Sequence, residues 1–224
     1  MGTINIHSIF ESISGEAGTG FPQGAWCTFI RFQGCDLDPH CVWCDTKDAQ
    51  EFKPKVAMSI GQILGKISTQ NVLITGGEPL AQNAGCVALL RELVDATHVV
   101  QVETNGAHPI PYYFGESVHW VVDYKCPSSG VDQQMLPWEE FDPWVFNRNV
   151  SFKFVVGNGT DVAFSLVKMD KLRGKIHEPV FIISPVDANG SKITSIRNEI
   201  NDFDPTLLDY VIFSIQLHKI TGMP

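Results

Sequence analysis

Short runs of β-branched and aromatic residues recur along the chain, and segments with helical periodicity separate them. Such runs predict β-strands over residues 26–33, 71–75, 98–103, 119–124, 151–156, 179–184 and 210–217. Several of them are apolar almost throughout, which is typical of strands buried on both faces. The helical pattern predicts helices over residues 84–97 and 191–203, and two more that begin at Ser59 and Asp161.

The order of these elements predicts an α/β fold. A strand followed by a helix and another strand makes a parallel pair, because parallel neighbours need a crossover connection. This many units can curl into a full or a partial barrel. Residues 105–150 are rich in proline, tryptophan and tyrosine and show no clear helix, so a complete eightfold barrel is not expected. With no linker or internal repeat in the chain, we predict one domain over residues 1–224, a partial (incomplete) TIM-like β/α barrel.

Composition and charge narrow the classes of function. Hydrophobic residues make up 44% of the 224 residues and charged residues 18%, as in ordinary soluble globular proteins. The formal net charge of -9 and the absence of lysine- or arginine-rich runs argue against a nucleic-acid partner. No apolar stretch approaches roughly 18 residues, and the amino-terminal segment lacks the pattern of a signal peptide. We therefore expect a cytoplasmic protein without a membrane partner.

Polar and glycine-containing motifs follow the predicted strands. Five of them lie where a strand ends: TGGEP (75–79), ETNG (103–106), DYKCPSSG (123–130), SPVD (184–187) and QLHK (216–219). In parallel α/β folds the carboxyl ends of the strands form the rim at which ligands bind. Five motifs at such positions predict an active-site rim rather than ordinary loops.

Three cysteines lie close together in CDLDPHCVWCDTK (35–47), with the spacing C-x5-C-x2-C. In a reducing compartment cysteines are thiols, so the cluster indicates a metal site rather than disulfide bonds. A structural zinc ion needs four ligands; His40 is poorly placed to be the fourth, and Cys27 and Cys86 have the apolar neighbours of core residues. A 4Fe–4S cluster held by three thiolates keeps one iron open. From these residues alone, a zinc-binding module without catalysis and an iron–sulfur enzyme remain alternatives.

The same segment resembles the cluster loop of the radical S-adenosylmethionine (SAM) superfamily, in which an aromatic residue precedes the third cysteine, as Trp43 does here. The usual spacing there is C-x3-C-x2-C, but the first spacing varies in one branch, the 7-carboxy-7-deazaguanine synthase family. The chain resembles that family over nearly its whole length, in IFESISGEAGTGFPQGAWCTFIRFQGC, WCDT, VLITGGEP, VETNG, DYKCPSSG, FKFVV and QLHKITGMP. The resemblance implies a barrel of the radical SAM type, in which the extra residues between Cys35 and Cys41 bulge outward.

The resemblance implies a carbon–nitrogen lyase. A 4Fe–4S cluster on Cys35, Cys41 and Cys44 would bind the amino and carboxylate groups of SAM and, once reduced, cleave SAM to methionine and a 5'-deoxyadenosyl radical. In the family this radical takes a hydrogen from C6 of 6-carboxy-5,6,7,8-tetrahydropterin. The pterin then rearranges to 7-carboxy-7-deazaguanine with loss of ammonia, at the entry to queuosine and other 7-deazapurines. The protein contributes positioning and the exclusion of side reactions.

The resemblance also implies site residues, none of them an acid–base catalyst, because the cluster and SAM carry the radical chemistry. The positions that contact SAM in the family correspond here to Trp43, Cys44, Asp45, Gly77, Glu78, Thr104, Asp123, Tyr124, Lys125, Ser184, Pro185, Val186 and Asp187. The Mg2+ position corresponds to Thr46, whose hydroxyl is a hard oxygen ligand. The positions that bind the pterin correspond to Ile13, Ser14, Gly15, Glu16, Arg31, Thr75, His218 and Pro224.

Two of the implied pterin residues have side chains that suit the substrate. Arg31 offers a planar fork that fits a carboxylate, and Glu16 can accept hydrogen bonds from the amino and ring N–H groups of the pterin. His218 and Pro224 have the spacing at which relatives bring a histidine and a terminal carboxylate into the pocket.

The family also suggests partners, namely an electron donor such as flavodoxin and a second copy of the chain in a homodimer. One alternative stays open within the same chemistry, an activating enzyme that makes a glycyl radical on a protein partner. Such enzymes have a similar size and a similar cluster loop. Glu16, Arg31, His218 and Pro224 favour the pterin.

Overall fold

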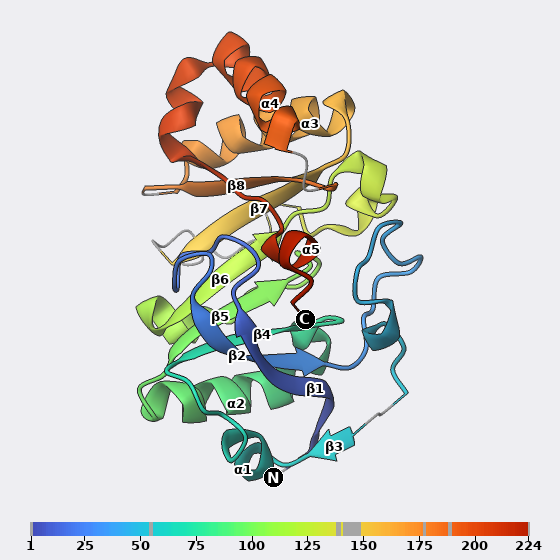
Figure 1. The fold of residues 1–224 in the computed structure, drawn as a ribbon, viewed down its shortest axis with the longest axis vertical. Coiled ribbons are helices and arrows are strands. Elements are labelled where there is room, and N and C mark those ends of the chain that lie inside the picture. Colours follow the sequence, from blue (N-terminus) through green and yellow to red (C-terminus); the bar gives the residue numbers. More distant parts are fainter. Residues whose placement is uncertain are drawn as a thin grey trace.

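The strands of the computed structural model are β1 (Ile4–Ile13), β2 (Trp26–Phe32), β3 (Val56–Met58), β4 (Asn71–Gly76), β5 (Val99–Thr104), β6 (Val118–Asp123), β7 (Val150–Val156), β8 (Val180–Pro185) and β9 (Val211–Phe213) (Figure 1). The structure describes residues 2–53, 56–137, 140, 149–176, 178–187 and 190–223. Within these ranges nine strands form one sheet, in the order β3-β1-β2-β4-β5-β6-β7-β8-β9. Neighbours from β2 to β9 pair in parallel, whereas β1 pairs antiparallel with β2 and with β3.

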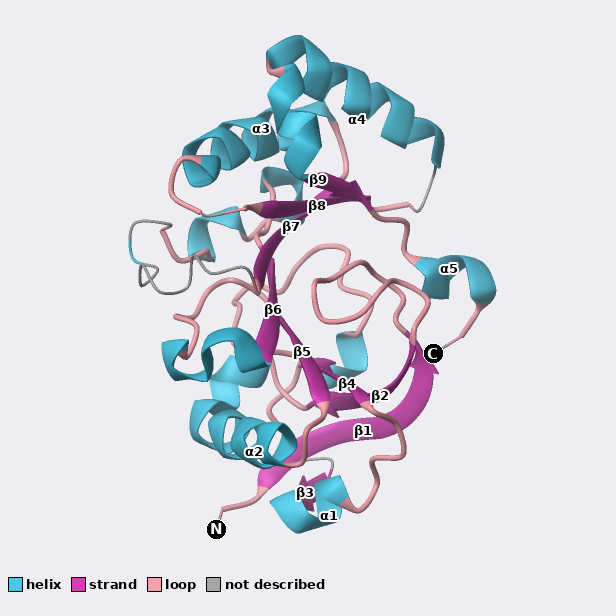
Figure 2. Cartoon of the chain, turned by 90° about the vertical axis from the view of Figure 1, so that its left-hand side faces the viewer, coloured by secondary structure: helices cyan, strands magenta, loops and turns pink. Residues whose placement is uncertain are grey.

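The helices are α1 (Ile60–Leu64), α2 (Asn83–Asp95), α3 (Gly159–Arg173), α4 (Gly190–Phe203) and α5 (Leu217–Thr221). Figure 2 shows the strands as an open arc, with α2, α3 and α4 on its outer side and α5 at the open side. Within the described residues β3 and β9 are the edges of the sheet and do not pair with each other, so the sheet is not closed. None of the helices described is long and apolar enough to cross a lipid bilayer.

The prediction of an α/β fold with a parallel sheet is confirmed. The seven expected strands correspond to β2 and β4 to β9, and the four expected helices to α1 to α4. The last strand is shorter than expected, because β9 ends at Phe213 and residues 217–221 form α5. We did not predict β1 or β3. The pairing of β1 with β2 shifts between Ile6 and Ser8, and such an irregularity interrupts the alternation by which a strand is recognised.

The two faces of the central strands have different chemistry. Side chains alternate between faces along a strand, so residues two apart share a face. The outward row packs under the helices in the main hydrophobic core and includes Phe32, Ile74, Val102, Val122 and Phe154. The inward row at the same level is polar and comprises Arg31, Thr75, Glu103, Asp123 and Lys153, from five neighbouring strands. The sheet therefore directs one polar row into the concave side of the arc.

The segment between β1 and β2 fills the lower part of the concave side. Phe21 packs with Phe29 and Leu73 in a separate small apolar cluster. Gly18 lies so close to the sheet that a Cβ atom there would stand 2.1 Å from Oε1 of Gln101. This packing closes the concave side around Gln101, below the polar row.

The turn after β4 packs directly against the chain that leaves β2. The backbone N–H of Gly77 donates to the carbonyl of Phe32 at 3.0 Å, and that of Glu78 donates to the carbonyl of Gly34 at 2.7 Å. A Cβ atom on Gly77 would stand 2.1 Å from the carbonyl oxygen of Gly34. The close approach of two backbones therefore requires glycine here, and it fixes the start of the cysteine loop relative to β4.

We predict that Gly77→Ala lowers the free energy of unfolding by about 1–3 kcal/mol, because the added methyl group forces two backbones apart. Urea unfolding of the metal-free protein under reducing conditions measures this. Gly61→Ala is the matched control, since a Cβ atom on Gly61 in α1 meets nothing within 4 Å. That control should be neutral or stabilising by up to about 1 kcal/mol. Equal stability of Gly77→Ala and the wild type would contradict the prediction.

Candidate active site

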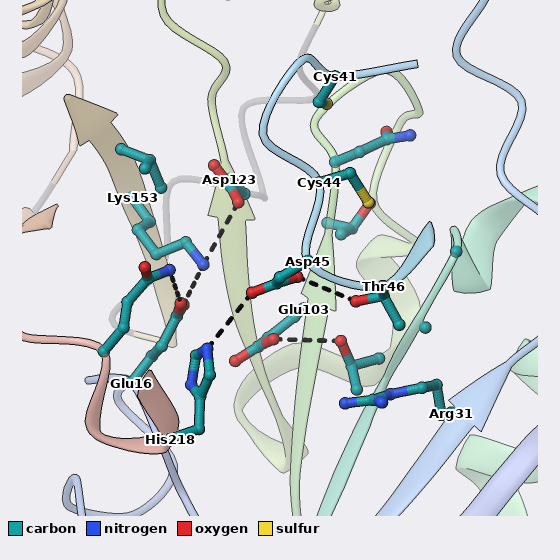
Figure 3. A pocket seen from close by; sticks show the side chains of 18 of the residues that line it. Glu16, Arg31, Cys41, Cys44, Asp45, Thr46, Glu103, Asp123, Lys153 and His218 are labelled. Atoms are coloured by element: carbon teal, nitrogen blue, oxygen red, sulfur yellow. Dashed lines mark hydrogen bonds and ion pairs between the residues drawn. The ribbon is translucent and has the colours of Figure 1, made fainter. Parts of the chain in front are cut away.

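A cavity of about 370 Å³ lies at the carboxyl ends of the central strands (Figure 3). Its walls include the polar inward row of the sheet, the turns after β4 and β5, the end of β1 with the residues that follow it, the cysteine loop and the segment around α5. The volume is in the range of small-molecule sites, which start at about 300 Å³. Four of the five motifs expected at the rim contribute residues to this cavity; the motif at 184–187 does not.

The three clustered cysteines line this cavity together. Cys35, Cys41 and Cys44 are half-buried free thiols. Burial raises the pKa of the Cys35 thiol to about 11 and also raises the pKa of Cys41. No group of three His, Cys, Asp or Glu side chains in the described part of the chain is arranged around a single metal ion. In an iron–sulfur cluster each thiolate binds its own iron, so three thiols on one cavity wall suit such a cluster.

The enlarged first part of the cysteine loop points partly inward. Asp38, Pro39 and His40 are exposed, as expected for an outward bulge, but Leu37 is only 2% exposed and packs in the main core. The backbone N–H of Asp38 donates to Oε1 of Gln134 at 3.0 Å. The bulge is thus anchored at Leu37 and Asp38.

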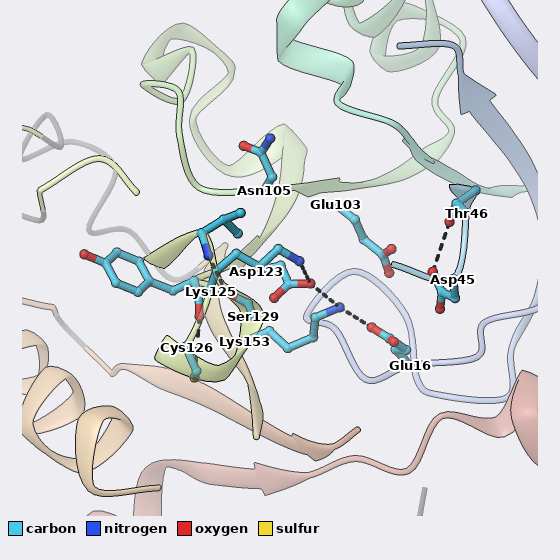
Figure 4. A network of polar contacts seen from close by, with 12 residues as sticks. Glu16, Asp45, Thr46, Glu103, Asn105, Asp123, Lys125, Cys126, Ser129 and Lys153 are labelled. Carbon is cyan, nitrogen blue, oxygen red and sulfur yellow. Dashed lines mark hydrogen bonds and ion pairs between the residues drawn. The ribbon is translucent and has the colours of Figure 1, made fainter. Parts of the chain in front are cut away.

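A buried ion network occupies the wall formed by β6 and β7 (Figure 4). Nζ of Lys125 lies 2.7 Å from Oδ2 of Asp123, and Nζ of Lys153 lies 3.3 Å from the same oxygen and also contacts Glu16. Burial opposes the charge of Asp123, but the two ammonium groups outweigh it and lower the pKa of the carboxyl. Burial likewise opposes the charge of Lys153, yet Asp123 and Glu16 raise its pKa well above the ordinary value. Asp123 and Lys153 are therefore charged despite their burial.

Two carboxyl groups of the cavity differ in how fully they are paired. Glu16 accepts hydrogen bonds from Lys153 and, at 2.6 Å, from Nε2 of Gln216. Glu103 accepts one from the Thr75 hydroxyl at 3.1 Å. Burial raises the pKa of Glu103 to about 7, although Lys153 lowers it in part. Glu103 is thus the carboxyl group with more unused acceptor capacity.

The end of the cysteine loop meets α5 across the cavity. Oδ2 of Asp45 lies 3.3 Å from Nε2 of His218, and the Thr46 hydroxyl donates to Oδ1 of Asp45 at 3.0 Å. Burial raises the pKa of Asp45, but His218 and Thr46 outweigh it, so the pKa lies below the ordinary value. The backbone N–H of Leu217 donates to the carbonyl of Gly15 at 2.8 Å, which joins α5 to the segment after β1.

Most of the residues expected at the site share this cavity. They are Ile13, Gly15, Glu16, Arg31, Cys35, Cys41, Trp43, Cys44, Asp45, Thr46, Thr75, Gly77, Thr104, Asp123, Lys125 and His218. Expected residues that do not line it are Ser14, Glu78, Tyr124, Ser184, Pro185, Val186 and Asp187. Pro224 lies outside the described residues.

The expected residues outside the cavity wall have other contacts. The Ser14 hydroxyl donates to the carbonyl of Glu16 at 2.9 Å, and the ring of Tyr124 is buried in the main core. Glu78 is fully buried and accepts from the backbone N–H groups of Leu80 and Asn105 and from Thr104. The motif at the end of β8 touches α5 through Lys219, whose Nζ donates to the carbonyl of Val186 at 2.9 Å. Glu78 therefore organises the turn instead of facing the cavity.

Several residues of the cavity wall were not predicted from the sequence. Glu103, Asn105, Lys153 and Gln216 line the cavity, and no role was assigned to them. Glu103 and Asn105 belong to the ETNG motif at the end of a strand, and a lysine inside the apolar run FKFVV is unusual. These two signals could have indicated the first three residues.

Unpaired polar atoms test whether the cavity suits a charged ligand. Nε of Arg31 and Oδ1 of Asp123 are buried and have no hydrogen-bond partner among the described residues. Buried polar groups are nearly always paired, so these atoms indicate a bound molecule with complementary groups. Together with the three thiols they fit an iron–sulfur cluster beside a small polar ligand that carries both acidic and basic groups.

Comparisons with known proteins identify the family of the chain. No protein-family model matches the chain. The chain is 35% identical over 228 residues to a 7-carboxy-7-deazaguanine synthase of Clostridium acetobutylicum, covering 96% of this chain and 94% of the relative. Enzymes of the same name from Methanospirillum hungatei and Koribacter versatilis are 30% and 31% identical, over 99% and 86% of this chain and 86% and 83% of the relatives. The chain therefore belongs to the 7-carboxy-7-deazaguanine synthase family of enzymes.

Proposed function

We propose that the enzyme is a radical SAM lyase that converts 6-carboxy-5,6,7,8-tetrahydropterin to 7-carboxy-7-deazaguanine and ammonia. The name of the relatives supports the product. The observation that carries the proposal is that three cysteines and the polar row of the sheet line one cavity. This arrangement suits a 4Fe–4S cluster next to a substrate that has a carboxylate and several N–H donors. The open sheet is accordingly the incomplete barrel of that superfamily.

Cys35, Cys41 and Cys44 would hold the cluster as thiolates, and the groups around Asp123 would hold SAM. Bound there, the cluster and SAM would supply the radical chemistry that abstracts hydrogen at C6 of the pterin. Oδ1 of Asp123 is buried and unpaired, so it can accept from a ligand hydroxyl or ammonium group. The ammonium of Lys125 lies beside it and suits a carboxylate of the ligand.

The pterin would lie between β2, β5 and α5. Arg31 has no carboxylate partner within the described residues, and its guanidinium sits 5.2 Å from the ring of Phe10, so its fork is free for the pterin carboxylate. Glu103 can accept from the amino and ring N–H groups, and Glu16 adds acceptor capacity beside it. Thr46 would ligate Mg2+ near the substrate, because a hydroxyl is a hard ligand for that ion.

We also propose the remaining features of the family for this chain. They are a cytoplasmic location, a single domain, a homodimer and reduction by a donor such as flavodoxin.

Anaerobic reconstitution followed by turnover tests the function. The protein should bind about four irons per chain. With a reductant, SAM and the tetrahydropterin, it should release 7-carboxy-7-deazaguanine, detected by mass spectrometry. One bound zinc ion without iron would contradict the proposal. So would cleavage of SAM that yields no deazaguanine, which is the result expected of an activating enzyme for a protein partner.

Replacement of Arg31 by glutamine should raise the KM for the pterin by about 10- to 100-fold, the cost of one or more hydrogen bonds to a charged group. Arg31→Lys is the matched variant, which keeps the positive charge but loses the planar fork of the guanidinium. Its KM for the pterin should therefore lie between those of the wild type and Arg31→Gln. Cleavage of SAM without the pterin should be equal in all three proteins. Steady-state kinetics measures KM, and an unchanged KM in Arg31→Gln would disprove the carboxylate contact.

Glu103→Gln should change how stability depends on pH. The raised pKa, about 7 in the fold against 4.5 ordinarily, means that the folded state binds more protons than the unfolded state between these values. The free energy of unfolding of the wild type therefore falls as the pH rises through this window, and the variant should lack this fall. Urea unfolding of the metal-free protein at several pH values between 4.5 and about 7 measures this change in the free energy of unfolding.

Glu199→Gln is the control for Glu103→Gln, because it removes an exposed carboxylate on α4 and should keep the pH dependence of the wild type. Parallel pH profiles of wild type and Glu103→Gln would show that Glu103 is ionised throughout the window, contrary to the prediction.

A further inference from the structure

Hydrogen-bond donors surround the sulfur of Cys35. Nδ2 of Asn105, at the end of β5, lies 4.0 Å from Sγ of Cys35. The backbone N–H of Leu37, in the enlarged part of the cysteine loop, also donates to this sulfur and opposes the effect of burial on its pKa. Figure 4 draws no interaction between the Asn105 side chain and the ion network of Lys125, Asp123 and Lys153.

The orientation of the Asn105 amide is fixed by its other contacts. Its Oδ1 accepts from the backbone N–H of Ala107 at 2.9 Å, so the nitrogen must point the other way, toward Cys35. The backbone N–H of Asn105 donates to the buried carboxylate of Glu78 at 2.6 Å. The residue is only 7% exposed. The amide thus cannot turn its oxygen toward the sulfur without losing a buried hydrogen bond.

Negative charge lies close to the same sulfur. Glu78 and Asp36 both raise the pKa of Cys35, after the larger effect of burial. Nδ2 of Asn105 also donates to Oδ1 of Asp36 at 3.5 Å, and Oδ2 of Asp36 lies 2.6 Å from Nε2 of His108. The negative charge near Cys35 disfavours the addition of an electron to a cluster bound there. The N–H groups of Asn105 and Leu37 oppose this effect.

We propose that Asn105 is a positioning residue for the iron–sulfur cluster: its amide N–H donates to the sulfur of Cys35, holds that ligand in place and raises the reduction potential of the cluster. This inference rests on the proposed function, since it requires a cluster on Cys35. A hydrogen bond to a ligand sulfur stabilises the electron-rich reduced state more than the oxidised state. Asn105 thereby makes the one-electron reduction that begins turnover easier.

Redox titration followed by EPR tests the proposal on the reconstituted enzyme. In Asn105→Ala the ratio of reduced to oxidised cluster at a fixed solution potential should fall about tenfold, which is a shift of about 59 mV to lower potential for one electron. In Asn105→Asp this ratio should fall further, because the substitution replaces a hydrogen-bond donor with a negative charge. Gln134→Ala is the control, because Gln134 contacts Asp38 and Pro39 in the same loop but not Cys35. The reduction potential of the cluster in this variant should equal that in the wild type.

A second measurement needs no variant. Wild-type protein labelled with 15N in asparagine side chains should show a 15N coupling to the reduced cluster in pulsed EPR. An absent coupling, or a potential in Asn105→Ala equal to that of the wild type at equal iron content, would overturn the inference and leave the proposed function intact. Wild-type protein that binds no cluster would instead refute the proposed function.

Discussion

The site depends on one buried ammonium group, Nζ of Lys153 on β7. It contacts Asp123 at the end of β6 and Glu16 after β1, and Glu16 in turn accepts from Gln216 just before α5. A buried ammonium without partners would cost several kcal/mol, so the charge is tolerated only when these segments come together. Because Lys153 must be paired with Asp123 and Glu16, segments of the cavity wall that are far apart in the sequence are held together.

Much of the fold could be predicted from the sequence because its signals are local. Apolar runs indicated the parallel strands, and Ser59 caps α1 through the capping box that such a serine favours. The antiparallel strand β1 was missed because its irregular pairing with β2 disturbs the alternation of its side chains. Residues 214–217 alternate polar and apolar side chains as a strand does, but the chain leaves the sheet there to reach Gly15 and Glu16, a contact that no local pattern encodes.

The candidate site, like the fold, could be predicted from the sequence only in part. The cysteine loop and the motifs at strand ends are contiguous segments, so their shared location followed from the rule that parallel strands end at one rim. The partners of individual side chains did not follow. Glu78 belongs to the TGGEP motif, yet its carboxylate accepts a hydrogen bond from the backbone N–H of Asn105, just after β5, and does not face the cavity. Lys153 gains its role from Asp123 and Glu16, and Glu103 is paired with Thr75. These partners lie on other segments of the chain, so the sequence of one strand cannot reveal them.

The position of α5 has a consequence for biosynthesis. The cysteine loop and α5 form facing parts of the cavity, and the ribosome makes the loop long before it makes α5. A growing chain therefore has its three thiols in place while one side of the cavity is still missing. The side of the cavity at α5 is therefore completed only after all the strands of the sheet have been made, when Gln216 and Leu217 reach Glu16 and Gly15.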